Sequence, residues 1–215
     1  DETEILPGSN LVLSSGLSEI TNALARGLNI KTSHQVTKIE YDKKVKITTA
    51  QSEFTSDYAI VTVPLGVLKK KKIQFIPELP EKKRNAIQNL GYGVINKVFL
   101  KFSKKFWSSE VPGFGLVGNS NNDSIEFLDL NPVKNTPILT GILSGENAIS
   151  LEKTGKKEII KDITDTLKKI YGNKTPSPLE MTHSRWNTDP FSFGTGSYLG
   201  INSEPEDFTS VAEPI

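Results

Sequence analysis

The stretch that says most about the fold is residues 57–107, DYAIVTVPLGVLKKKKIQFIPELPEKKRNAIQNLGYGVINKVFLKFSKKFW. Its apolar run YAIVTV, residues 58–63, predicts a strand, and Pro64 ends that strand because proline has no N–H to donate to a ladder. Further on, Pro80 stands in the favoured first-turn position of a helix, and Gly91 is a natural left-handed residue with which to end it. The stretch therefore predicts a strand followed by a helix.

Alternating apolar residues predict more strands downstream. NKVFLKF places Val98, Leu100 and Phe102 on one face of a strand and Lys97 on the other. SIEFLDL and PILTGILS have the same character. We expect all of them to belong to one sheet.

Two further helices are predicted on either side of these strands. Residues 16–28 carry apolar side chains at helical spacing, with an N-cap among residues 14–16. Residues 156–171 have the same periodicity and stop at Gly172. The apolar positions are Leu17, Ile20, Leu24 and Leu28 in the first helix, and Ile159, Ile160, Ile163, Leu167 and Ile170 in the second.

The region between the first helix and Pro64 predicts an antiparallel β-meander over residues 31–64. QVTKIEY and KVKITT alternate around a turn at Asp42 and Lys43, and YAIVTV follows as the third strand. Residues 73–184 are expected to form a mixed sheet, with the helices after Pro80 and over 156–171 packed beside it. Because strands and helices do not alternate regularly, the fold class is α+β.

Composition excludes several classes of function. The 215 residues carry 26 basic and 25 acidic side chains, so the net charge of +1 does not suggest a nucleic-acid surface. Zero cysteines exclude a disulfide framework, thiol catalysis and thiolate metal sites. No apolar run approaches the ~20 residues of a membrane span, and DETEILPGSN is no signal peptide. These absences favour the cytoplasm. Lysines 69–72 are typical of a solvated turn.

Residues 113–118, GFGLVG, have the G-x-G-x-x-G spacing of a dinucleotide-binding loop. Such a loop needs a strand before its first glycine and a helix at its last, whose free N–H groups hold a pyrophosphate. Here NSNND, residues 119–123, is typical of a turn instead. We therefore interpret these glycines as part of a strand and turn.

Other catalytic patterns are weak. The two histidines, His34 and His183, lie far apart in the sequence, so no metal site is expected. No G-x-S-x-G elbow is present for a serine hydrolase. A pair of cooperating carboxylates stays open, because such pairs meet only in the folded protein.

Residues 57–107 closely resemble the flavin-dependent amine oxidases, the family of polyamine oxidases, monoamine oxidases and flavin-type histone lysine demethylases. The shared features occur in order: VPLGVL, IQFIPELP, a K-x-x-A-I helix, LGYG, NKV and a strand ending in F-x-x-x-FW. RWNTDPFSFGTGSYLG, residues 185–200, resembles a second segment of the family, and GLSEITNALARGL with QVTKIEY is similar to the region just upstream. The resemblance covers essentially the whole chain.

The resemblance implies an FAD cofactor and a division into domains. Residues 1–65, with the helix and the meander, would belong to the FAD-binding domain. Residues 66–190, with the mixed sheet and its flanking helices, would form the substrate-binding domain, and residues 191–215 would return toward the FAD domain. Pro64 and Leu65 would mark the exit from the FAD domain. The family's pyrophosphate loop and its G-E-x-T segment do not occur here, so we expect an internal fragment that does not retain FAD by itself and is inactive.

The resemblance also assigns roles to five residues. Lys97 would be the catalytic residue, holding a water next to flavin N5, and the backbone of Val36 would contact the adenine end of FAD. Trp186 would lie near the flavin ring, and Tyr198 would wall the substrate amine. Phe191 would line the same cavity, although the spacing after Asp-Pro is two residues longer than in the demethylases. We expect Lys97, Trp186 and Tyr198 to approach one open cleft.

The function that the resemblance implies is oxidation of an amine or polyamine at its C–N bond, by hydride transfer to FAD and reoxidation by molecular oxygen to give hydrogen peroxide. No nucleic acid and no membrane segment are expected. A binding module without catalysis, and a related flavoprotein such as a protoporphyrinogen oxidase or carotenoid desaturase, stay open as alternatives. The NKV lysine favours amine oxidation over the related flavoproteins.

Overall fold

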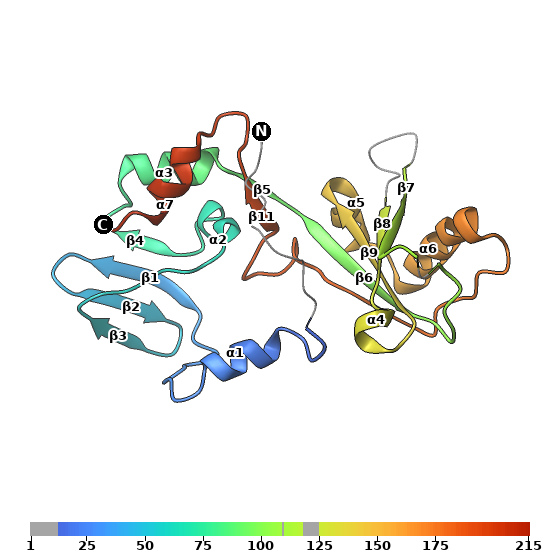
Figure 1. Ribbon diagram of the computed structural model, residues 1–215. Coiled ribbons are helices and arrows are strands. Elements are labelled where there is room, and N and C mark those ends of the chain that lie inside the picture. The colour runs from blue at the N-terminus through green and yellow to red at the C-terminus, as the bar shows by residue number, and fades with distance from the viewer. Residues whose placement is uncertain (1–12, 109, 118–124) are drawn as a thin grey trace.

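The computed structural model describes residues 13–108, 110–117 and 125–215, which form two regions, each built on one large sheet (Figure 1). We call them the mixed-sheet region and the antiparallel-sheet region. Strand β6, Ile95–Lys101, leads from the first into the second. The segment between β10, Glu180–His183, and β11, Thr195–Tyr198, leads back. No helix in the described residues is long and apolar enough to cross a membrane.

The mixed-sheet region contains a four-stranded sheet in the order β3-β2-β1-β4. Its strands are β1 Val36–Tyr41, β2 Val45–Thr49, β3 Glu53–Ser56 and β4 Gln74–Ile76. The hairpin of β1 and β2 is confirmed, but β4 runs parallel to β1. A parallel pair needs a crossover connection, and helix α2, Leu65–Lys69, lies within it. The predicted antiparallel meander is therefore part of a mixed sheet.

The third strand of the predicted meander is wrong: it is Glu53–Ser56 and not residues 58–63. Thr49 causes the difference because it closes a tight turn. Its Oγ1 accepts hydrogen bonds from the backbone N–H groups of Gln51 at 3.2 Å and Ser52 at 3.0 Å. The chain reverses at once, and β3 pairs antiparallel with β2 from residue 53 onward.

Residues 58–63 form no strand within the described part of the chain, so Pro64 does not end one. Tyr58 and Ile60 are 90% and 91% exposed. Pro64 is instead the N-cap of α2, a place where its missing N–H breaks no helical hydrogen bond. Helix α2 buries Val67 in a small core with Ile39 and Ile73.

Helix α3, Glu81–Asn89, starts after Pro80 as predicted. It packs against α2 and against α7, Pro205–Ala212, in the mixed-sheet region, and not beside the other sheet as expected (Figure 1). Ala86 is fully buried in α3, and such a small side chain allows neighbouring helices to approach closely.

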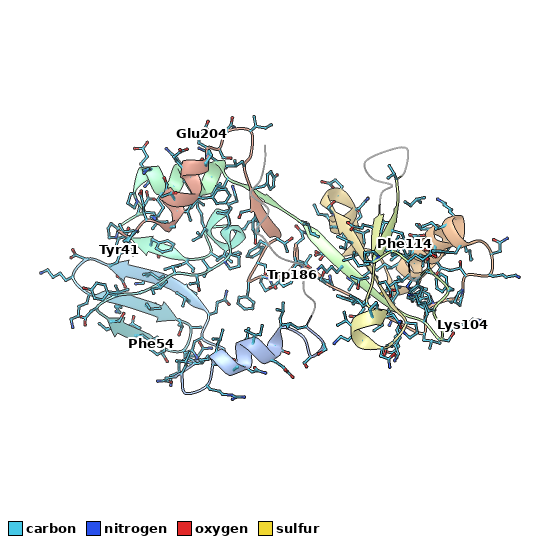
Figure 2. All side chains as sticks on the ribbon, in the orientation of Figure 1. Tyr41, Phe54, Lys104, Phe114, Trp186 and Glu204 are labelled. Atoms are coloured by element: carbon cyan, nitrogen blue, oxygen red, sulfur yellow. The ribbon has the colours of Figure 1, made fainter. Side chains whose placement is uncertain are left out.

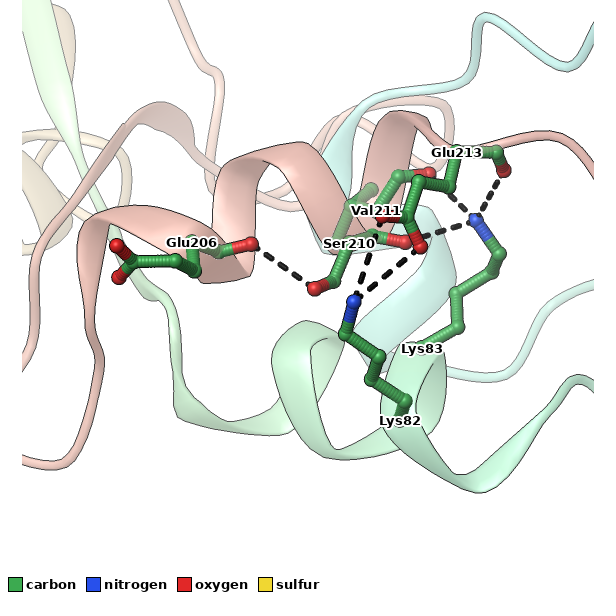
Figure 3. A network of polar contacts seen from close by, with 6 residues as sticks. All are labelled: Lys82, Lys83, Glu206, Ser210, Val211 and Glu213. Atoms are coloured by element: carbon green, nitrogen blue, oxygen red, sulfur yellow. Dashed lines mark hydrogen bonds and ion pairs between the residues drawn. The ribbon is translucent and has the colours of Figure 1, made fainter.

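Lys83 ties α3 to the end of α7 (Figure 3). Its Nζ donates to the backbone carbonyls of Ser210 and Val211 at 2.9 Å each and of Glu213 at 2.6 Å. These are carbonyls that the end of a helix leaves without an intrahelical partner. Burial, the largest influence, lowers the pKa of Lys83. The neighbouring Lys82 makes only an exposed ion pair with Glu213, at 3.4 Å.

Gly91 does not end α3 in a left-handed conformation, so that prediction is wrong. Leu90 is the C-cap, and Gly91 opens β5, Gly91–Gly93, which pairs antiparallel with β11. A Cβ on Gly91 would lie 2.3 Å from the ring of Tyr198. The ring of Tyr198 thus occupies the space that a side chain at position 91 would take.

Helix α1, Ser18–Leu24, is shorter than the predicted 16–28 and has Leu17 as its N-cap. A turn follows, with Gly27 at a φ of 77°, and a residue in that conformation cannot continue a helix. The apolar positions predicted for this helix are exposed.

The antiparallel-sheet region holds a five-stranded sheet in the order β10-β6-β9-β8-β7. The other strands are β7 Gly113–Leu116, β8 Ile125–Asp129 and β9 Ile138–Ser144. Every pairing among its described residues is antiparallel, so the predicted mixed sheet over 73–184 is wrong. A short connection suffices for an antiparallel pair; between β8 and β9 it contains only α4, Asn131–Lys134.

The core of this region lies between the sheet and helix α6, Lys156–Tyr171, which is confirmed with its end at Gly172. The residues predicted to face inward are fully buried: Val98 and Leu100 in β6, and Phe102 just after its end. Helix α5, Gly145–Leu151, precedes α6 and contributes Leu151 to the same core.

The glycine-rich stretch at 113–118 begins as a strand, as we interpreted it. Strand β7 pairs with β8, and a Cβ on Gly113 would lie 2.8 Å from the backbone oxygen of Phe127. Residues 118–124, which include the predicted turn, lie outside the described residues.

Candidate active site

Hydrogen bonds connect the segment between β10 and β11 to the first residues of β6. The backbone N–H of Lys97 donates to Ser184 Oγ at 2.9 Å, and the N–H of Ser184 donates to the carbonyl of Lys97 at 3.0 Å. Two residues later the N–H of Trp186 donates to Asn96 Oδ1 at 3.2 Å. The backbones of Lys97 and Trp186 are therefore held next to one another.

Asn96 is the centre of this arrangement and is 0% exposed. Its Oδ1 also accepts the hydroxyl of Ser184 at 2.9 Å. Its Nδ2 donates to the carbonyl of Ala148 at 3.0 Å and to Glu152 Oε1 at 2.7 Å. All the bonding capacity of the amide group is used, as a buried polar side chain requires.

Glu152 is buried and accepts two backbone N–H groups of the same segment. Asn187 donates to Oε1 and Thr188 donates to Oε2, both at 2.8 Å. Burial acts to raise the pKa of Glu152, but the hydrogen bonds from Asn96, Thr188 and Asn187 hold that pKa below its ordinary value. The group is therefore a carboxylate at neutral pH.

Trp186 lies between the two regions of the molecule, with 42% of its surface exposed (Figure 2). Its carbonyl accepts the N–H of Gly194 at 2.8 Å, one residue before β11. Between these residues Asp189 orders the turn, accepting the N–H of Phe191 at 2.8 Å and the hydroxyl of Ser192 at 3.1 Å. An exposed aromatic ring thus stands on a well-ordered backbone.

Tyr198 and Lys97 are also exposed. Tyr198 lies on β11 with its ring against Gly91. Lys97 lies on the face of β6 opposite the buried Asn96 and Val98. The N–H of Ile95 donates to Thr195 Oγ1 at 2.9 Å, so the starts of β6 and β11 are joined directly.

A pocket of about 640 Å³ opens in the mixed-sheet region, a size common for small-molecule sites. It brings Val36 of β1 and Phe191 together. The other lining residues are Lys31, Ser33, His34, Gln35, Ala50, Gln51, Thr62, Val63, Pro64, Val67, Lys72, Ile73 and Pro190. Lys97, Trp186 and Tyr198 do not line this pocket. Within the described residues no three ligating side chains gather as a metal site would require.

Two solved structures that share this fold are a cyclohexylamine oxidase and a putrescine oxidase. Cyclohexylamine oxidase from Brevibacterium oxydans matches 93% of this chain and 45% of that chain, with a TM-score of 0.75 and 19% identity. A redesigned putrescine oxidase matches 86% and 42%, with a TM-score of 0.71 and 19% identity. At this identity the likeness defines the class of fold.

The sequence identifies the family. Residues 2–215 match the model of the flavin containing amine oxidoreductases, and the chain belongs to that family. It is 36% identical over its whole length to the rice protein named lysine-specific histone demethylase 1 homolog 1, and 37% identical over 96% of its length to polyamine oxidase 2 of Arabidopsis thaliana. The chain spans 26% and 42% of those two proteins. The predicted resemblance is confirmed.

The pocket has a size and a lining that suit a planar aromatic ring system. Its lining is largely apolar around Val36 and Val63, as a planar aromatic base requires. Gly66 of α2 lies beside the pocket, and a Cβ on it would lie 2.1 Å from the carbonyl oxygen of Ser192. The segment between β10 and β11, which contains Ser192, therefore packs directly on α2. The sequence interpretation named Val36 and Phe191 but missed Asn96 and Glu152.

Proposed function

We propose that this chain forms part of a flavin-dependent amine oxidase, which oxidises an amine or polyamine at a C–N bond. The observation that carries the proposal is the family match over residues 2–215. FAD, when bound, would accept a hydride from the carbon next to nitrogen and pass the electrons to oxygen, giving an imine and hydrogen peroxide.

Val36 and the pocket around it would bind the adenine end of FAD, the contact being made through the backbone of Val36. Trp186 would cover the flavin ring and exclude water from it. A large aromatic side chain suits this role when it is exposed and its backbone is held by a hydrogen bond, as that of Trp186 is by Asn96. We assign none of the described residues to the pyrophosphate of FAD. Since the chain spans 26% to 42% of its relatives, we expect the 215 residues alone not to retain FAD and to be inactive.

Lys97 would hold an ordered water beside the reacting carbon and nitrogen. Its side chain is exposed on β6 while its backbone is fixed at both the N–H and the carbonyl by Ser184. An ammonium in such a place stabilises negative charge that develops nearby and can position a water for hydrolysis of the imine.

Tyr198 and Phe191 would form the walls of the substrate site. Both rings are more than half exposed, and the face of an aromatic ring attracts an alkylammonium group. The substrate class is thus a small amine or a polyamine. A methylated lysine side chain is the second candidate, because the chain is 36% identical to a protein named as a histone lysine demethylase.

To test this proposal, the complete protein that contains this chain is purified and its visible absorption spectrum is recorded. We expect a flavin spectrum that bleaches without oxygen on adding spermine, spermidine or a simple monoamine. Bleaching by a methylated lysine peptide alone would assign the second substrate. A colourless protein that fails to bind added FAD would refute the proposal.

The role of Lys97 has its own control on the same strand. Lys97→Met should slow the bleaching at least tenfold and leave the unfolding temperature unchanged. Lys101→Met, on the same face of β6 and paired only at the surface with Glu180, should leave the rate as it is. Equal rates in the two variants would remove Lys97 from the mechanism.

A further inference from the structure

Three consecutive backbone N–H groups, those of Trp186, Asn187 and Thr188, donate to side chains of the antiparallel-sheet region. The first donates to Asn96, and the other two donate to Glu152. Asn96 and Glu152 are bonded to one another at 2.7 Å. Two buried side chains from distant parts of the chain therefore meet on one short segment of backbone, and that segment carries an exposed tryptophan.

This arrangement is costly as a purely structural device. Within the described residues no cation pairs with the carboxylate of Glu152; Arg185 reaches only the backbone carbonyl of that residue, at 3.2 Å. A buried carboxylate without a counter-ion loses its hydration, and only the hydrogen bonds that it accepts make up for that loss. What an apolar residue cannot do is accept two N–H groups and so fix the position of the backbone that carries them.

We propose that Glu152 and Asn96 are positioning residues, which hold the backbone of residues 184–188 on the start of β6 and thereby fix Trp186 beside the residue that follows Asn96, Lys97. Ser184 completes the arrangement, because its hydroxyl donates to Asn96 while it accepts the N–H of Lys97. The importance of this geometry for flavin rests on the function proposed above. The positioning of Trp186 does not rest on it.

The geometry makes a specific prediction for Glu152→Gln. Every group that meets the Glu152 carboxylate is a donor: Asn96 Nδ2 and the N–H of Asn187 at Oε1, the N–H of Thr188 at Oε2, and the side chain of Thr188. The amide NH2 of glutamine therefore faces a donor in either orientation, and at least one hydrogen bond is lost. The matched control is Glu146→Gln, the same chemical change on the exposed face of α5.

The experiment labels the complete protein with 5-fluorotryptophan and follows the fluorine resonances without and with FAD. The two tryptophans of this chain are assigned by Trp186→Phe and Trp107→Phe. We expect Glu152→Gln to shift the resonance of Trp186 and leave that of the core residue Trp107 in place, and Glu146→Gln to shift neither. In FAD titrations Glu152→Gln should weaken binding about tenfold.

An unmoved Trp186 resonance in a folded Glu152→Gln protein would overturn the inference, as would equal shifts at Trp186 and Trp107. If Glu152→Gln does not fold, Ser184→Ala decides, because it removes one hydroxyl without leaving a buried charge unpaired: a selective shift of Trp186 supports the inference and no shift refutes it. If no variant binds FAD but the selective shift is seen, the proposed function fails and the positioning role stands. If FAD binds equally to all variants and Trp186 does not move, the positioning role fails and the proposed function stands.

Discussion

The two regions of the molecule are held together in different ways. The antiparallel-sheet region packs eleven buried apolar residues of its sheet, of the segment after β6, and of α5 and α6 into one cluster. The buried cluster of the mixed-sheet region has three, Ile39, Val67 and Ile73. In the mixed-sheet region this small core is supplemented by hydrogen bonds between elements, such as those of Lys83, and by close backbone contacts at Gly66 and Gly91. The pocket opens in that region. The larger buried core and the pocket thus lie in different regions of the molecule.

The largest expected difference between the regions is the cost of truncating a core side chain. Phe127→Ala, at a fully buried position of β8, should lower the free energy of unfolding by about 3–5 kcal/mol, and Ile73→Ala by about 2 kcal/mol. Urea unfolding of the two variants measures both. A larger cost for Ile73 would overturn the comparison.

Lys83→Met tests whether polar ties hold the mixed-sheet region. The variant leaves three carbonyls at the end of α7 without their donor, which should cost about 1–3 kcal/mol and speed proteolysis within residues 205–213. Its neighbour supplies the control: Lys82→Met removes only an exposed ion pair and should change stability by less than about 0.5 kcal/mol. An equal loss of stability in the two variants would show that the hydrogen bonds of Lys83 contribute no more than the exposed ion pair of Lys82.

Acid should act mainly on the antiparallel-sheet region. Burial raises the pKa of Asp129, but hydrogen bonds from Lys105, at 2.7 Å, and from the backbone of Asn131 outweigh burial and lower it. Its stabilising contribution is therefore complete above the pKa of an unfolded aspartate, about 3.9, and is lost as the pH falls through the lower folded-state value. Asp129→Asn should flatten the loss of stability between about pH 4 and pH 2, and the exposed Asp162→Asn should not. Parallel curves for both would contradict this.

The smallest effect on the free energy of unfolding is expected for Gly91→Ala. This variant should affect amine binding more than stability. The added Cβ meets the ring of Tyr198, and a half-exposed ring can turn aside, so the cost should be about 1 kcal/mol. The displaced ring should raise the KM for the amine. Gly155→Ala, where a Cβ meets no atom within 4 Å, should change neither quantity.

Sequence periodicity predicted the elements whose burial is strongly one-sided. The alternation of Val98, Leu100 and Phe102 and the helical spacing over 156–171 were sufficient for β6 and α6. The third strand of the meander was missed because the turn depends on one hydroxyl, that of Thr49, and apolar content pointed to 58–63 instead.

The candidate site was partly visible in the sequence. Extending the alternation of β6 back by two residues from Val98 places Asn96 on the buried face, and a polar residue there is a signal that could have been used. Nothing comparable exists for Glu152. Its neighbours in the sequence do not distinguish it from an exposed glutamate, and its burial arises only when residues 184–188 fold over it.

Strand β6 alternates between the buried amide of Asn96 and the exposed ammonium of Lys97 in a single step along the chain. A slip of one residue in the register of β6 against β9 would turn the lysine inward and the asparagine outward, because neighbouring positions in a strand face opposite ways. Only Val94 separates β5 from β6, so an inserted residue would find almost no loop to absorb it.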